Sequence, residues 1–255
     1  MKKIFIAFFI LITSIAYTEE KKYESPMTLY NDTYMIAGNT NAQVKIQLST
    51  KFNLLYPSNT GIYMGYTQLS KWIVYNNRDT FYTMYMPEAF YQYESGNNIF
   101  GNSIIPFIDY IQVSPVIHCS TGTEGVDHRS MNTYYGQVQS SYGDVFNIGL
   151  NIKAFGYYKE ISKRNKDINK YRKNYEADVF FKIRSKTVEY LDKEELHFKF
   201  GGNPRGNGWY CIEARFRLVT GYIQPKLFVQ FYSGYNEFMI DYNKKTRSIR
   251  AGVVF

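Results

Sequence analysis

The segment Val145–Tyr157, VFNIGLNIKAFGY, decides the fold class of this chain. From Phe146 to Lys153 every second residue is apolar, and every residue between is polar or glycine. Successive side chains of a strand point to opposite faces, so this segment predicts a strand with one apolar and one polar face. Such a strand suits a β-sandwich, with the apolar face inward, or a membrane barrel, with the apolar face toward lipid.

The rest of the chain breaks into similar short runs separated by turn residues, and helical periodicity nowhere extends beyond about two turns. These runs predict twelve strands, an even number that suits a closed barrel. We place the strands near 33–40, 43–54, 61–74, 80–93, 107–120, 130–140, 144–157, 173–185, 194–202, 208–219, 226–236 and 246–255. The alternation within 107–120 is poor, which indicates a β-bulge whose position the sequence leaves open.

Residues 1–16 have the pattern of a secretory signal peptide. Lys2 and Lys3 form its charged start, Ile4–Ile12 its apolar core and Ser14–Ala16 a small-x-small cleavage site. The apolar core is much shorter than the ~20 residues of a membrane-spanning helix, which argues against a helical anchor. We therefore divide the chain into a signal peptide at 1–16, an N-terminal periplasmic segment at 17–32 and an outer-membrane β-barrel at 33–255.

Aromatic content and the carboxyl end favour the membrane barrel over the sandwich. The chain has 26 Tyr and 19 Phe among 255 residues, and aromatic residues form girdles at both interfaces of membrane barrels. The last predicted strand alternates from Ile249 to a terminal Phe255, and an aromatic carboxyl end is common in bacterial outer-membrane barrels. We predict an all-β fold, a twelve-stranded antiparallel transmembrane β-barrel in the bacterial outer membrane.

The chain is moderately basic, with 30 Lys and Arg against 22 Asp and Glu. Removing Lys2 and Lys3 with the signal peptide would leave a net charge of +6. The basic residues are spread along the chain without a nucleic-acid-binding motif, so we expect no nucleic-acid partner. A basic segment at 159–173 becomes an external loop in this scheme, either in contact with phosphates of outer-membrane lipid or solvated.

Candidate catalytic residues lie at the end of the fifth predicted strand. His118 and Ser120 are two positions apart, so in a strand they project from the same face about 6 to 7 Å apart. Asn132 follows a glycine-bearing turn, and the next antiparallel strand would bring it beside His118. These residues supply a nucleophile, a base and a group that orients the base. With both termini periplasmic, the active site is expected toward the outer leaflet.

The two cysteines, Cys119 and Cys211, are too few for a disulfide scaffold, although a single bridge between them stays open. Cys119 lies between His118 and Ser120, so a catalytic thiol is an alternative hypothesis. In a strand, however, Cys119 would point to the face opposite the histidine.

The pattern resembles that of bacterial outer membrane phospholipase A, a His-x-Ser-x-Gly segment followed by Arg-Ser-x-Asn. The matching residues, with their spacing preserved, are His118, Ser120, Gly122, Arg129, Ser130 and Asn132. Further similarity lies at Tyr66–Gln68, Arg78–Thr80, Tyr232–Tyr235 and Ile240–Asn243. The resemblance covers nearly the whole chain after the signal peptide.

This resemblance implies a homodimeric, calcium-stimulated serine esterase, a phospholipase A1 and A2 that hydrolyses the sn-1 or sn-2 acyl ester of phospholipids. Ser120 would be the nucleophile and His118 the general base. Asn132 would orient His118, as an aspartate does in other serine hydrolases, and the Gly122 N–H would hold the oxyanion. A neutral amide costs less near lipid than a carboxylate, which is a rationale for asparagine at this position.

Two positions depart from the family pattern for the calcium (Ca2+) site. Thr121 stands where the family often has Asn, and His128 stands where it has a Ser that binds calcium. Calcium prefers oxygen donors to imidazole. By position, Thr123 and His128 are the expected metal residues; the Thr123 carbonyl could still serve, and Glu124 or Asp127 could substitute for the missing serine.

Gln68 is predicted at the dimer interface. Within Ile62–Val74 it shares a lipid-facing side with Tyr66 and Trp72. An amide in hydrocarbon requires a hydrogen-bond partner, and a second subunit would supply one. The alternative is an interfacial glutamine that contacts lipid headgroups.

The sequence therefore predicts an outer-membrane phospholipase that acts on membrane phospholipid. Two alternatives stay open. One is a small non-catalytic barrel for transport or adhesion, in which His118 and Ser120 are incidental. The other is a barrel that deacylates lipid A.

Overall fold

The structure is a computed structural model, and it describes most of the chain from residue 25 onward. The described residues are 25–38, 43–55, 61–73, 80–94, 108–122, 129–143, 145–158, 167–172, 174–184, 192–203, 207–217 and 225–255. The predicted signal peptide at 1–16 lies outside them, so the division of the chain into three parts stays a prediction.

Within the described residues the chain forms thirteen strands and two short helical segments. The strands are β1 (Met27–Leu29), β2 (Tyr34–Gly38), β3 (Gln43–Asn53), β4 (Gly61–Ile73), β5 (Thr80–Glu94), β6 (Tyr110–Gly122), β7 (Arg129–Tyr142), β8 (Phe146–Tyr157), β9 (Tyr175–Arg184), β10 (Asp192–Asn203), β11 (Asn207–Arg217), β12 (Lys226–Gly234) and β13 (Thr246–Val254). The helical segments are α2 (Ile168–Tyr171) and a 3₁₀ turn, η3 (Met239–Asp241).

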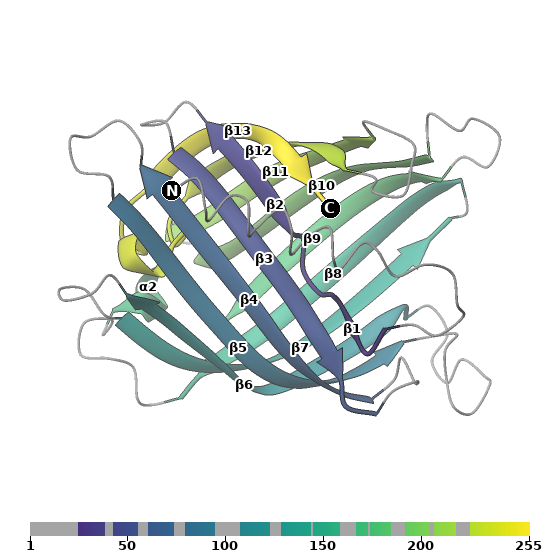
Figure 1. The fold of residues 1–255 in the computed structure, drawn as a ribbon, viewed down its shortest axis with the longest axis horizontal. Helices are drawn as coiled ribbons and strands as arrows, with labels where there is room; N and C mark the ends of the chain where they lie inside the picture. The colour runs from purple at the N-terminus through teal and green to yellow at the C-terminus, as the bar shows by residue number, and fades with distance from the viewer. Residues whose placement is uncertain are drawn as a thin grey trace.

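The strands β2 to β13 form one antiparallel sheet that closes on itself. Each pairs with its neighbours in the sequence, and β13 pairs with β2 through Ala251 opposite Ala37. Figure 1 shows these strands slanting across the barrel wall. Closure pairs the backbone groups that lipid could not satisfy. The predicted all-β, twelve-stranded antiparallel barrel is confirmed, with strand ends within a few residues of the predicted ones.

The barrel is apolar outside and polar inside. In β8, Phe146 is 75% exposed and Ile148 is 45% exposed, whereas Asn147 between them is buried. Met64 of β4 and Ile249 of β13 also face outward. A soluble sandwich would bury these side chains, so their exposure along several strands marks a lipid-facing surface. Among the described residues, no helix is long and apolar enough to cross a membrane.

Buried ion pairs occupy part of the interior. Arg250 of β13 is only 1% exposed, and its guanidinium donates to Glu237 at 3.0 Å and to Gln43 at 3.2 Å. Lys45 Nζ lies 3.4 Å from Glu237 Oε1. Burial opposes ionisation of Glu237, but the charges of Lys45 and Arg250 outweigh it and hold the pKa of Glu237 below its ordinary value. One carboxylate therefore pairs with two buried cations.

A second network centres on Arg215 of β11. Its guanidinium lies 2.7 Å from Glu195 and 3.0 Å from Glu213, and it also pairs with Asp32. His197 joins the network through Glu195, at 3.1 Å. Because Asp32 precedes β2, this network ties the N-terminal part of the chain to β11, which lies three strands from β2 around the barrel.

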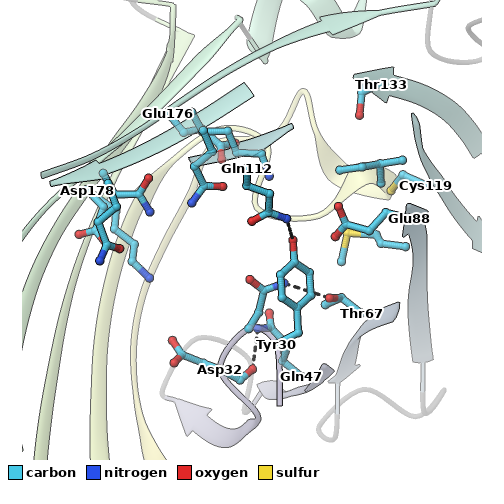
Figure 2. A pocket seen from close by; sticks show the side chains of 18 of the residues that line it. Tyr30, Asp32, Gln47, Thr67, Glu88, Gln112, Cys119, Thr133, Glu176 and Asp178 are labelled. Atoms are coloured by element: carbon cyan, nitrogen blue, oxygen red, sulfur yellow. Dashed lines mark hydrogen bonds between the residues drawn. The ribbon is translucent and has the colours of Figure 1, made fainter. Parts of the chain in front are cut away.

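Residues 27–32, assigned from the sequence to an N-terminal periplasmic segment, lie against and inside the barrel. β1 pairs with β3 through Met27 opposite Phe52. Tyr30 then points inward, where its hydroxyl accepts from Gln112 and bonds the Tyr135 hydroxyl at 3.0 Å (Figure 2). Tyr30, Asn31 and Asp32 help to line an interior cavity of about 660 Å³.

Replacing Glu237 with alanine is expected to destabilise the barrel by about 3–5 kcal/mol, because Arg250 and Lys45 would stay buried without their shared carboxylate. The free energy of unfolding is measured by denaturant titration in detergent micelles. The control is Lys244→Ala, which removes an exposed ion pair to Asp241 worth about 1 kcal/mol or less. Equal destabilisation of both variants would contradict the role given to Glu237.

Candidate active site

The candidate catalytic residues lie near the rim of the barrel where β6 ends at Gly122 and β7 begins at Arg129. This end is termed the active-site rim. Two segments pack inside the barrel here: Ile168 of α2 and Met239 of η3 belong to one apolar cluster with Cys119 of β6. Figure 1 shows α2 beside the yellow connection between β12 and β13. The strands β6 and β7, which carry the candidate residues, are therefore supported from the inside.

His118 and Asn132 lie directly opposite each other on β6 and β7. The His118 Nδ1–H donates to Asn132 Oδ1 at 2.7 Å. With the proton on Nδ1, Nε2 is free to accept a proton from a nucleophile. His118 is exposed on the outer face of the barrel and Asn132 is half-buried. The structure thus brings His118 and Asn132 together, as their spacing predicts.

Ser120 lies two residues beyond His118 on the same outer face and is half-buried. It is opposite Ser130 of β7 and Tyr85 of β5. Gly122 follows as the last residue of β6, with its backbone beside the serine. The sequence did not single out Tyr85; alternation within 80–93 places it outward, but only the register between β5 and β6 sets it opposite Ser120.

The cysteines take no part in this set. Cys119 is 3% exposed and faces the interior, where it packs in the cluster with Met131. It therefore points away from His118, and the alternative of a catalytic thiol loses its geometric basis. Cys211 is also buried, and both cysteines are free thiols, so the bridge that the sequence left open is not formed.

The expected metal ligands all lie outside the described residues. Thr123, Glu124, Asp127 and His128 fall within 123–128, outside the described residues. Thr121 is buried on the inner face. Across the described part of the chain, no group of three or more His, Cys, Asp or Glu side chains could hold a metal ion. The calcium ligand set stays a prediction.

Gln68 lies on the outer face of β4, in one transverse row with Tyr85 and Ser120. The Tyr66 hydroxyl donates to Gln68 Oε1 at 3.2 Å, and Gln68 Nε2 donates to Ser70 Oγ at 3.3 Å. A glutamine amide can make about four hydrogen bonds, so part of its capacity remains for another group. This polar row crosses a surface that is otherwise largely apolar.

The interior cavity is separate from the catalytic set. Cys119 and Thr133 line it, and Figure 2 shows both pointing inward. His118, Ser120 and Asn132 are not among the described residues that line it. A substrate for Ser120 therefore has to approach along the outer, lipid-facing surface.

Known proteins share both the sequence and the barrel. A family model described as phospholipase A1 matches residues 5–255. The putative phospholipase A1 of Neisseria meningitidis serogroup B is 26% identical over 226 residues, which is 84% of this chain and 54% of that protein. The phospholipase A1 of Salmonella typhimurium is 25% identical over 260 residues, 92% of this chain and 83% of that protein. This chain thus spans about half the length of the Neisseria relative.

Two solved structures show the same fold. Outer membrane phospholipase A from Escherichia coli has a TM-score of 0.72 at 20% identity, covering 91% of this chain and 98% of that chain. The Salmonella typhi outer membrane phospholipase dimer with bound calcium has a TM-score of 0.72 at 21% identity, covering 96% of each chain.

The resemblance predicted from the motif is therefore confirmed at the level of the family. The closed barrel with a lipid-facing surface, shared with outer-membrane proteins, places this chain in the outer membrane. Because the family model matches nearly the whole sequence, the chain belongs to the phospholipase A1 family.

Proposed function

We propose that this protein hydrolyses the sn-1 and sn-2 acyl esters of membrane phospholipids as a serine esterase. The observation that carries the proposal is the 2.7 Å hydrogen bond between His118 and Asn132, on the lipid-facing surface beside Ser120. At the active-site rim this surface meets the headgroup region, where phospholipid ester groups lie. We place that rim toward the outer leaflet.

In the acylation step, Ser120 Oγ attacks the ester carbonyl carbon while His118 Nε2 takes the hydroxyl proton. Asn132 holds the Nδ1–H and so maintains this tautomer. The Gly122 N–H donates to the oxyanion, and loss of one such donor costs about 3–4 kcal/mol. The ester C–O bond then breaks, His118 returns the proton to the leaving oxygen, and a lysophospholipid departs.

Deacylation repeats these roles with water as the nucleophile. His118 takes a proton from water, which attacks the acyl group on Ser120, and a fatty acid leaves as Ser120 regains its proton. Asn132 stabilises the imidazolium less than an aspartate would. A carboxylate on a lipid-facing surface, however, costs more to desolvate than an amide, which favours asparagine here.

Oxygen donors around the active-site rim fit calcium. Ser130 lies on the outer face opposite Ser120, and by their positions in the sequence Thr123 and Asp127 would add a carbonyl and a carboxylate. His128 fits less well, because imidazole is a poor ligand for this cation. Bound calcium would supply positive charge beside the oxyanion. The calcium in the related Salmonella typhi dimer supports this proposal.

A homodimer would cover the polar row on the outer face. Gln68 and Tyr85 place an amide and a hydroxyl group on a surface that faces hydrocarbon, where such groups favour association. The row continues to Ser120. A second subunit seated on β4 and β5 would therefore lie beside the catalytic residues of the first.

A transport or adhesion barrel and a lipid A deacylase remain the alternative functions. Tyr30 and the ion pairs of Arg215 and Arg250 occupy the interior of the barrel, which argues against a transport function that needs an open channel. Fatty-acid release from phospholipid vesicles, compared with release from purified lipid A, separates the two enzymatic hypotheses. A pure transporter or adhesin would release neither.

Ser120→Ala and His118→Ala are each expected to lower phospholipid hydrolysis on the order of a thousandfold or more, because nucleophile and base act as a unit. Fatty-acid release in mixed micelles measures the loss, and resistance to unfolding confirms that each barrel forms. Cys119→Ser is the matched control and should keep activity near that of the parent. Parental activity in a folded Ser120→Ala variant would exclude the mechanism.

Calcium is expected to raise activity, and excess chelator to lower it. His128→Ser should tighten the apparent calcium dissociation constant, because a hydroxyl replaces an imidazole at a calcium position. Calcium titrations of parent and variant, followed by isothermal calorimetry as well as by activity, give both constants. Full activity in excess chelator would show that this chain needs no metal.

Gln68→Ala is expected to weaken the dimer about fivefold or more, because it removes polar contacts worth on the order of 1 kcal/mol in lipid. Analytical ultracentrifugation in detergent micelles measures the dissociation constant, and activity should recover at high protein concentration. Ile249→Ala, which trims a lipid-facing side chain of β13 away from the row, is the control. An unchanged dissociation constant in Gln68→Ala would leave Gln68 as a headgroup contact.

A further inference from the structure

The strand that carries His118 and Ser120 reverses its facing direction partway along. Gln112 and Ser114 are 2% and 1% exposed and point inward, so even-numbered residues line the interior before residue 115. Beyond it the odd-numbered residues do so. Figure 2 shows Gln112 and Cys119 pointing into the same cavity although they lie an odd number of positions apart, which a regular strand does not allow.

A β-bulge between Ser114 and Ile117 causes the reversal. Tyr91 of β5 pairs with Val113 of β6, and Ala89 pairs with Val116. A step of two residues along β5 therefore matches a step of three residues along β6. On the other side, Ser114 pairs with Tyr135 of β7 and Ile117 pairs with Thr133, so two residues of β7 again match three of β6. β6 therefore contains one extra residue relative to both neighbours. This locates the bulge that poor alternation in 107–120 predicts.

The bulge determines which side of the wall carries the catalytic residues. If the alternation of Gln112 and Ser114 continued, His118 and Ser120 would line the interior cavity and Cys119 would face lipid. With the extra residue, His118 and Ser120 face outward and His118 lies opposite Asn132. A phospholipid in the bilayer can reach only the outward arrangement.

Two hydroxyl groups hold this bulge from opposite sides of the wall. From inside, the Ser114 hydroxyl is within bonding distance of two carbonyls, Ala89 O at 2.9 Å and Val116 O at 3.2 Å. From outside, the Tyr158 hydroxyl donates to Pro115 O at 2.6 Å. A proline is tolerated at a bulge because its missing N–H leaves no ladder bond unmade.

Tyr158 also contacts the strand that carries the orienting amide. Its backbone N–H donates to Asn132 O at 3.1 Å. Its ring lies edge-on to Tyr134, with centroids 5.4 Å apart at an interplanar angle of 68°. Tyr158, which directly follows β8, thus links Pro115, three positions before His118, to the backbone of Asn132.

We propose that Tyr158 is a positioning residue for hydrolysis: its hydroxyl fixes the β6 bulge and its backbone fixes Asn132, so the imidazole and amide stay aligned beside Ser120. The role rests on the proposed function of Ser120 and His118. Tyr158 acts through the bulge and through Asn132. Ser114 supports the same bulge from the interior.

The first test is Tyr158→Phe, which removes the bond to Pro115 O and keeps the ring and the backbone N–H. We expect kcat to fall about five- to tenfold with KM within about twofold of the parent, because the alignment of His118 changes and substrate contacts do not. Tyr134→Phe, which removes a hydroxyl from the adjoining ring, is the control and should match the parent. The readouts are fatty-acid release and thermal unfolding.

The second readout is the reaction of Ser120 with an alkylsulfonyl fluoride, which forms a sulfonate ester at Oγ and releases fluoride. Its rate should fall in Tyr158→Phe by the same factor as kcat. Ser114→Ala should also slow it, and the double variant should lose less than the product of the two single losses, because both hydroxyls hold one bulge. If Ser114→Ala does not fold, Tyr158→Phe decides alone.

Parental kcat and sulfonylation in folded Tyr158→Phe would overturn the proposal. So would a rise in KM at constant kcat, which indicates a substrate contact, or a lower unfolding temperature with parental kcat per folded molecule, which indicates stability alone. A parent protein that is never sulfonylated at Ser120 would instead contradict the proposed function itself. The two failures are therefore distinguishable.

Discussion

A strand that spans a membrane must pair its backbone within the wall and face lipid with apolar side chains, and this constraint organises the whole chain. Apolar side chains such as Phe146 face outward, which leaves charged and polar side chains for the interior. Arg250 can lie there only because Glu237 and Gln43 accept its hydrogen bonds. Asp32 likewise pairs with Arg215, so the N-terminal segment supplies a carboxylate to an interior cation.

The proposed catalytic set is an exception to this polarity. His118, Ser120 and Asn132 are polar groups on the outer face, and each must reduce its exposure to hydrocarbon or find a partner. The His118–Asn132 bond satisfies one group from each residue without a formal charge. Their place near the end of the strands, toward the interface, lowers the cost further because polar substitutions are cheaper there than at the midplane.

Period and spacing were enough to predict the barrel and the pairing of His118 with Asn132, because alternation and strand order are local properties of the sequence. The position of the bulge was not predictable, since it depends on the register of β6 against both β5 and β7. Tyr158 was missed for the same reason: its bond to Pro115 joins strands that are not adjacent in the sheet. Ion-pair partners such as Asp32 and Arg215, far apart in the sequence, also left no periodic signal.

Stability and chemistry use opposite faces of the same strands. Between the outward-facing His118 and Ser120, Cys119 packs inward against Met131, so the apolar cluster beneath the active-site rim supports the backbone that aims the catalytic pair. The outer face, by contrast, keeps polar capacity at Gln68 that the single chain uses only in part. A subunit that used this capacity would cover surface in the same transverse row as Ser120, and assembly would then change the surroundings of the nucleophile without any rearrangement of the interior.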